Sequence, residues 1–223
     1  MMNRANTNEY ATNNAFERAV LKRKISSLGY GFFTEPALRK LVLEGDDTTK
    51  KLNELLDTFL FRPKRVVFSS ASLNPFINQL ISTPTYIVEV EKDFLEAFFE
   101  IARDEFPGRV FFAPTEKERL RYGWSGNILL YPLLTKSPTS KDGAMPIEKL
   151  IVDLICSPRY FTLFSGEDVE QALHLLADGH EMNLRTIFAY AKRKKKEAIV
   201  FEKLKETLGS DYSEVLDAIQ KKI

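Results

Sequence analysis

Two carboxylates and a lysine lie close together at the end of a predicted strand. Glu89, Glu91 and Lys92 are the residue types that hold a divalent ion and orient a water molecule in metal-dependent nucleases. Their spacing argues against this use, because the adjacent Glu91 and Lys92 project to opposite faces of a strand. No upstream aspartate lies on a comparable strand. The preferred interpretation is therefore a solvated strand face that ends in a lysine. A metal-dependent nuclease is kept as the alternative.

A second group of polar residues could contact DNA. Three predicted short helices with tight turns, followed by a strand at residues 65–68, are typical of a winged helix-turn-helix, whose third helix enters the major groove. Hydroxyl, amide and cationic side chains on that helix would contact base edges or phosphates, and cations beside the wing would contact the backbone. The predicted DNA-binding residues are Thr48, Thr49, Lys50, Lys51, Asn53, Arg62, Lys64 and Arg65.

The same segment also fits a plain three-helix cap with solvated lysines and threonines. Asp46 and Asp47 at the start of the third helix favour the helix macrodipole but would repel phosphate. A protein-interaction module whose N-terminal helices never meet DNA is therefore the alternative to a DNA-binding domain.

The densest positive run is a possible basic patch near the end of a predicted helix. It consists of Lys192, Arg193, Lys194, Lys195 and Lys196. Cations are favourable at a helix C-terminus, but five in a row exceed what the dipole needs. The run indicates either a solvated helix end or a contact with a phosphate backbone or an acidic partner.

The remaining reactive residues predict no catalytic site. Cys156, the only cysteine, follows an apolar helix and reads as a buried thiol, and no internal disulfide is possible. His174 and His180 do not have the spacing of a zinc site. Phosphate-binding glycine loops and nucleophile elbows are also missing from the sequence. We therefore expect a non-enzymatic protein with no cofactor and no metal.

The composition is that of an ordinary globular protein. Of its 223 residues, 44% are hydrophobic and 28% are charged, and the net charge is +1. A partner that is a polyanion would therefore have to be met by a local cluster of cations. The sequence has neither a secretory leader nor an apolar run of spanning length, so we expect a cytoplasmic protein without a membrane contact.

The elements that position these residues predict an α+β or α/β fold. Residues 1–13 are interpreted as a flexible arm and residues 14–70 as a winged-helix-like DNA-binding domain, followed by a C-terminal α/β domain over residues 71–223. Strand patterns at 85–92, 109–114 and 127–134 alternate with helices and predict a small mixed sheet. The most apolar segment, residues 144–158, predicts a buried helix that opens a helical C-terminal half.

Three segments carry a family resemblance. MPIEKLIVDLI, FSGEDVEQAL and NLRTIFAYAKRKKK, in this order, resemble the C-terminal half of AbiE-type antitoxins, which belong to type IV toxin–antitoxin and abortive-infection systems of phage defence, and a related group of uncharacterised bacterial proteins. The segments LNPFINQL and TYIVEVEKDFLEAFF resemble that related group, and the likeness spans roughly residues 65–205.

The resemblance implies a winged-helix N-terminal domain that binds operator DNA, so that the protein acts as a transcription repressor of its own operon. It also implies a C-terminal α/β antitoxin domain that counters a nucleotidyltransferase-like toxin, with or without direct contact. The DNA-reading residues given above come from the pattern and not from the resemblance.

Overall fold

The computed structural model of the chain describes residues 26–29, 32–34, 40–115, 117–118, 125–157 and 163–220. Its centre is a four-stranded mixed sheet with the order β3-β4-β6-β5. The strands are β3 (Arg65–Ser69), β4 (Tyr86–Val90), β5 (Val110–Phe112) and β6 (Ile128–Pro132). β3 runs antiparallel to β4, whereas β4, β6 and β5 are parallel. The prediction of an α+β fold with a small mixed sheet and a helical C-terminal half is confirmed.

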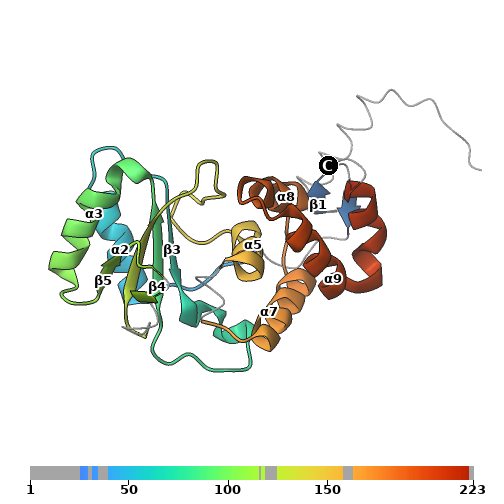
Figure 1. Cartoon of the computed structure of the whole chain (residues 1–223), viewed down its shortest axis with the longest axis horizontal. Helices are drawn as coiled ribbons and strands as arrows, with labels where there is room; N and C mark the ends of the chain where they lie inside the picture. Colours follow the sequence, from blue (N-terminus) through green and yellow to red (C-terminus); the bar gives the residue numbers. More distant parts are fainter. Residues whose placement is uncertain are drawn as a thin grey trace, which may run out of the picture.

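Helices cover both faces of this sheet (Figure 1). The helices α2 (Asp47–Asp57) and α3 (Lys92–Glu105) pack on one face, where Leu52, Phe98 and Leu130 share a core. The helix α5 (Ile147–Cys156) covers the opposite face, where its apolar side chains meet Ile87 and Leu129. Successive side chains of a strand point to opposite faces, so each central strand contributes to both cores.

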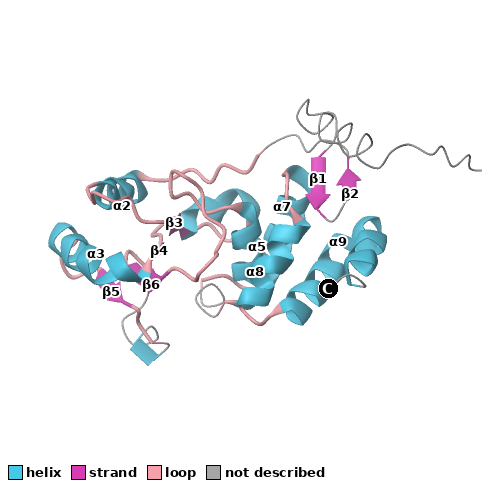
Figure 2. Cartoon of the chain, turned by 90° about the horizontal axis from the view of Figure 1, so that it is seen from above, coloured by secondary structure: helices cyan, strands magenta, loops and turns pink. Residues whose placement is uncertain are grey.

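The chain beyond α5 adds further helices on the same side. These are α7 (Gly166–Gly179), α8 (Leu184–Arg193) and α9 (Glu197–Gln220), which pack against α5 and one another. Viewed from above in Figure 2, they lie with α5 on one side of the strands, and α2 and α3 lie on the other. A 3-10 helix, η1 (Ser70–Phe76), links β3 toward β4 and contacts α7. None of the described helices could span a membrane.

The buried helix predicted at residues 144–158 is α5. Pro146 is its N-cap and Ser157 its C-cap, and every residue between them except Glu148 is buried. Proline suits this position because its ring presets the backbone angle and no amide hydrogen is needed there. The predicted strands at 85–92, 109–114 and 127–134 correspond to β4, β5 and β6.

The N-terminal segment differs from the predicted three helices and wing. Most of the first predicted helix, residues 14–25, lies outside the described residues, but β1 (Ser26–Gly29) pairs antiparallel with β2 (Phe32–Thr34). Residues 40–43, the expected end of the second helix, are not helical, whereas the expected third helix is present as α2.

The interpretation of residues 65–68 as a wing is wrong. This segment is β3, which hydrogen-bonds to β4 along its whole length and is buried at every position. Its other edge is covered by residues 143–144, because the Val67 amide donates to the Gly143 carbonyl at 2.8 Å. β3 is therefore a buried outer strand of the main sheet, which continues across the predicted boundary between residues 70 and 71.

Candidate functional site

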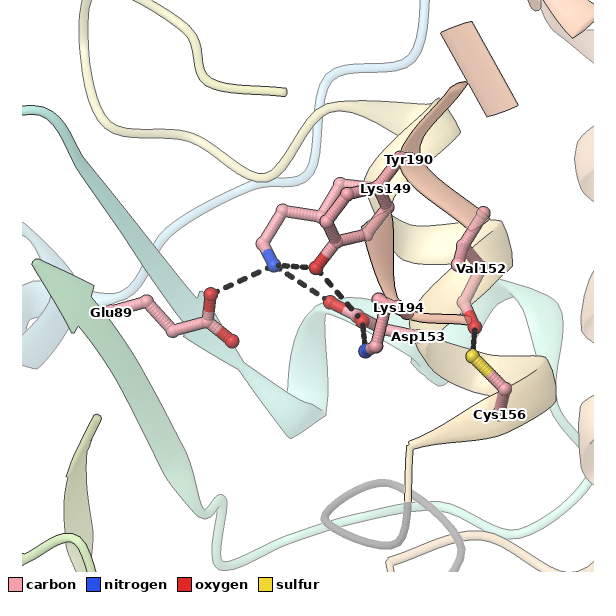
Figure 3. Close-up of polar contacts among 7 residues, drawn as sticks. All are labelled: Glu89, Lys149, Val152, Asp153, Cys156, Tyr190 and Lys194. Carbon is pink, nitrogen blue, oxygen red and sulfur yellow. Dashed lines mark hydrogen bonds and ion pairs between the residues drawn. The ribbon is translucent and has the colours of Figure 1, made fainter. Parts of the chain in front are cut away.

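A cluster of ionisable side chains is buried where α5 meets the sheet and α8 (Figure 3). We call it the buried ionic cluster, and its members are Glu89, Lys149, Asp153, Tyr190 and Lys194. The Lys149 ammonium lies 2.8 Å from a Glu89 carboxylate oxygen and 2.8 Å from Asp153. It also donates to the Tyr190 hydroxyl at 2.8 Å. These three acceptors match the three hydrogens of the ammonium group.

Three elements position the cluster. Lys149 and Asp153 are four residues apart on α5, so they lie on one face of the helix. Glu89 points from β4 toward α5, the side of the sheet that Ile87 also faces. Tyr190 comes from α8, and its hydroxyl donates to Asp153 at 3.2 Å. Lys194, the C-cap of α8, forms an ion pair with the same carboxylate.

The charges in this cluster stabilise one another despite their burial. Burial alone would lower the pKa of Lys149, but the carboxylates of Glu89 and Asp153 outweigh it and hold the pKa above its ordinary value. Burial would raise the pKa of Asp153, yet Lys149 and Lys194 keep it below its ordinary value. Two cations thus balance two carboxylates, and the Tyr190 pKa is raised by burial and by Asp153.

This arrangement favours a structural role over a catalytic one. The Lys149 side chain has no exposed surface and its ammonium stays protonated, so it has no lone pair for nucleophilic or base chemistry. The described residues also contain no cluster of side chains suited to a metal ion. The arrangement joins the sheet to two helices with directional hydrogen bonds.

The three residues of the alternative nuclease hypothesis are not brought together. The structure places Glu89 in the buried ionic cluster, whereas Glu91 accepts from the Lys64 amide at 3.0 Å. Lys92 is exposed in the first turn of α3. The three side chains therefore serve different parts of the molecule.

The predicted DNA-binding residues form two groups. Three of them bind within the protein, contrary to the expectation of an exposed, DNA-facing set. Arg65 is 5% exposed, donating to Asn53 Oδ1 at 2.8 Å and Asp57 at 2.9 Å. The Thr49 hydroxyl, also buried, donates to the Asp46 carbonyl. The expected exposure is wrong for Arg65 and Thr49, because Arg65 joins β3 to α2 and Thr49 bonds to the N-cap residue of α2.

Three further members of the set lie at the surface beside carboxylates. Lys50 is 3.3 Å from Asp47, Lys51 is 3.4 Å from Glu105 and Arg62 is 3.6 Å from Asp57. Thr48 is half-buried and Lys64 is exposed. The positive potential of this face is thus reduced by neighbouring acids.

The basic run at residues 192–196 is divided between core and surface. Lys194 turns inward to Asp153, so this member of the predicted patch is part of the buried ionic cluster. The other four are exposed. Lys192 lies 3.8 Å from Glu197, and Arg193 Nε donates to the Thr135 carbonyl at 3.4 Å.

The sequence analysis missed Lys149 and Tyr190 as functional partners. Lys149 interrupts an apolar helix four residues before an aspartate, which is the available signal for an internal ion pair. Asp153 pairs with Lys149 and Lys194, whereas Glu148 accepts from the Asn183 amide at 3.1 Å. Cys156 is buried as expected; burial raises the pKa of its thiol, which donates to the Val152 carbonyl.

Comparison with known proteins identifies the family. Residues 13–210 match the model of a family described as "Family of unknown function (DUF6577)". The chain belongs to this family. No curated protein and no solved structure matches the chain.

The DUF6577 match extends across the whole arrangement described above. It includes α2, all four strands of the mixed sheet and the helices α5, α7 and α8. Every residue of the buried ionic cluster lies within it. A single family therefore covers both segments that the sequence analysis interpreted as separate domains.

Proposed function

We propose that this protein is a cytoplasmic, non-enzymatic antitoxin that counters a nucleotidyltransferase-like toxin. The supporting observation is that the three segments with the AbiE resemblance form α5, α7 and α8 and pack as one unit. Lys149 and Asp153 from the first segment bind Tyr190 and Lys194 from the third. The residues that define the resemblance are thus the ones that hold the helical half to the sheet.

The proposal is tested by co-expression with a nucleotidyltransferase reading frame, if sequencing of the neighbouring genes finds one. The antitoxin proposal expects the intact protein to restore growth of cells in which that frame is toxic. Lys149→Met should reduce the rescue because it disrupts the packed helical unit, whereas the surface change Lys117→Gln should leave it intact. Growth arrest that persists with the intact, folded protein would refute the antitoxin function.

The proposal includes autorepression through operator DNA. Here the support is the resemblance together with the exposed cations Lys50, Arg62 and Lys64 and the half-buried Lys51. A gel shift with the protein's own upstream DNA should show retardation that weakens as salt rises. Replacing these four cations by glutamine should weaken it. Absence of retardation at low salt would refute autorepression but would not affect the antitoxin proposal.

A protein-interaction module without DNA binding is the second candidate. The pairing of Lys50, Lys51 and Arg62 with carboxylates favours it, because each acid cancels part of the attraction to phosphate. The same gel shift, repeated with the variant in which the four cations are glutamine, separates the two candidates. For a module of this kind the four substitutions leave any retardation unchanged, and the protein still rescues growth when it is co-expressed with the toxin.

A further inference from the structure

A positive surface lies where α8 ends beside the loop that follows β6. We call it the basic edge, and its members are Lys136, Lys192, Arg193, Lys195 and Lys196. Arg193 Nε joins the two segments by donating to the Thr135 carbonyl at 3.4 Å. Arg193 and Thr135, which are 58 positions apart in the chain, thus lie side by side. Lys136 is the residue that directly follows Thr135.

The basic edge lies at the carboxyl end of the parallel strands. The Leu133 amide donates to the Val90 carbonyl at 2.8 Å, which places the end of β6 against the end of β4. The segments that leave these two strands lie at the upper side of the sheet in Figure 1. In open α/β sheets this is the side at which ligands bind, because the chain connections leave room there.

Two lysines of the basic edge have a backbone conformation that is unfavourable for a side chain. The φ angles of Lys136 and Lys195 are 61° and 57°, in the left-handed region that favours glycine. A left-handed lysine costs roughly 1 kcal/mol relative to glycine. Asparagine or glycine at either turn would remove the strain together with a charge.

The cations of the basic edge are largely free of intramolecular partners. Lys194, the one member of the run that turns inward, already neutralises Asp153 in the core. Within the described part of the chain, Glu197 at 3.8 Å from Lys192 is the one carboxylate paired with the basic edge. This differs from the face of α2, where three cations lie within 4 Å of acids. In a protein of net charge +1, the basic edge is a local excess of positive charge.

The residue types favour phosphate over a protein partner. Four of the five members are lysines, which are depleted in protein–protein interfaces but bind phosphates as point charges. The exposed aromatic side chains among the described residues, Phe61 and Phe112, lie in other segments. We therefore propose that the basic edge binds the phosphate backbone of a nucleic acid.

The binding of this surface does not depend on the antitoxin proposal, and its test uses a different readout. Fluorescence anisotropy of the full chain is measured with a labelled 20-base-pair DNA duplex and a 20-nucleotide RNA strand. About four phosphate contacts should make log K fall by roughly 3 to 4 for each tenfold rise in salt on the duplex. The ratio of the two affinities identifies the preferred nucleic acid.

Paired variants assign the binding to the basic edge. Lys195→Gln/Lys196→Gln should weaken binding at least tenfold and reduce the salt slope by about 2. Lys40→Gln/Lys117→Gln removes two exposed lysines that have no ion pair with a described residue, and it should leave affinity and slope close to those of the wild type. If the two double variants lost affinity for the nucleic acid equally, the proposal would be overturned.

Lys136→Gly separates binding from folding. Glycine relieves the left-handed backbone, so the variant should melt at the same or a higher temperature while binding nucleic acid more weakly. Polyglutamate serves as an acidic-peptide competitor. If it displaced the nucleic acid at equal residue concentration, or if no nucleic acid bound at low salt, the assignment to a phosphate backbone would be wrong.

Discussion

At the scale of single residues, the buried ionic cluster is the feature with the largest expected energetic effect. Replacing Lys149 by methionine keeps the length of the side chain but leaves Glu89 and Asp153 buried with one cation fewer. Removal of one partner of a buried ion pair typically costs about 3–5 kcal/mol. We expect Lys149→Met to lower the free energy of unfolding by that amount in urea titrations.

The matched control is Lys50→Met, which removes an exposed lysine next to an exposed aspartate. Exposed ion pairs contribute roughly 0–1 kcal/mol, so this variant should unfold nearly as the wild type does. If both variants lost a similar free energy of unfolding, burial of the cluster would contribute little to stability.

The pH dependence of the cluster follows from the lowered pKa of Asp153. Burial opposes ionisation, but Lys149 and Lys194 hold the pKa below its ordinary value. A carboxylate whose folded pKa is depressed stabilises the fold above its unfolded pKa of about 3.9, and the contribution is lost as pH falls through the folded value. The destabilisation caused by Asp153→Asn should therefore be constant near pH 7 and shrink below about pH 4.

This prediction is checked by urea unfolding of wild type and variant between pH 7 and pH 3. Glu96→Gln removes an exposed carboxylate of α3 and provides the comparison. A difference between wild type and Asp153→Asn that grows toward acid pH would contradict the assigned ion pairs.

At the scale of elements, local sequence patterns predicted which segments form helices and strands, but not which segments pair with one another. The apolar run was sufficient to predict α5, alternating residues predicted β4, and a short apolar segment predicted β6. The place of β3 was not predictable, because an apolar strand of five residues fits either a wing or a buried strand. The partner of Lys149 on α8 lies 41 residues away, and no local spacing indicates it. For the same reason Arg65 was assigned to DNA and not to Asn53.

The loop before α5 offers a test of how β3 is held. Gly143 has a φ of 80°, and a Cβ atom there would lie 2.4 Å from Asn53 Oδ1, the acceptor of the Arg65 hydrogen bond. Gly143→Ala should lower the free energy of unfolding by about 2–4 kcal/mol, since backbone strain and the displaced hydrogen bond both act. Differential scanning calorimetry measures this effect.

Gly108 provides the control because it has a φ of 75° but nothing within 4 Å of an added Cβ. Gly108→Ala therefore carries the backbone strain alone, roughly 1–2 kcal/mol. If both alanine variants were destabilised equally, close packing against Asn53 would not contribute.

At the scale of the whole molecule, the position of β3 determines where the chain can be divided. The boundary predicted between residues 70 and 71 separates β3 from β4, its hydrogen-bonded neighbour. Val67 belongs to the core under α2, whereas Val66 and Phe68 belong to the core under α5. A fragment of residues 71–223 would thus lose the strand that contributes to both cores, together with α2.

We expect this fragment to unfold without a cooperative transition, whereas residues 40–223 should melt cooperatively. Circular dichroism melting and limited proteolysis of the two fragments make the comparison. Removal of β3 also exposes the edge of β4, so the shorter fragment should aggregate more readily. A cooperative melt of residues 71–223 would show that β4, β5 and β6 with their helices are sufficient, and that β3 is an addition to an independent domain. The expected outcome requires one cooperative unit that begins before β3, which is consistent with a family match that starts at residue 13.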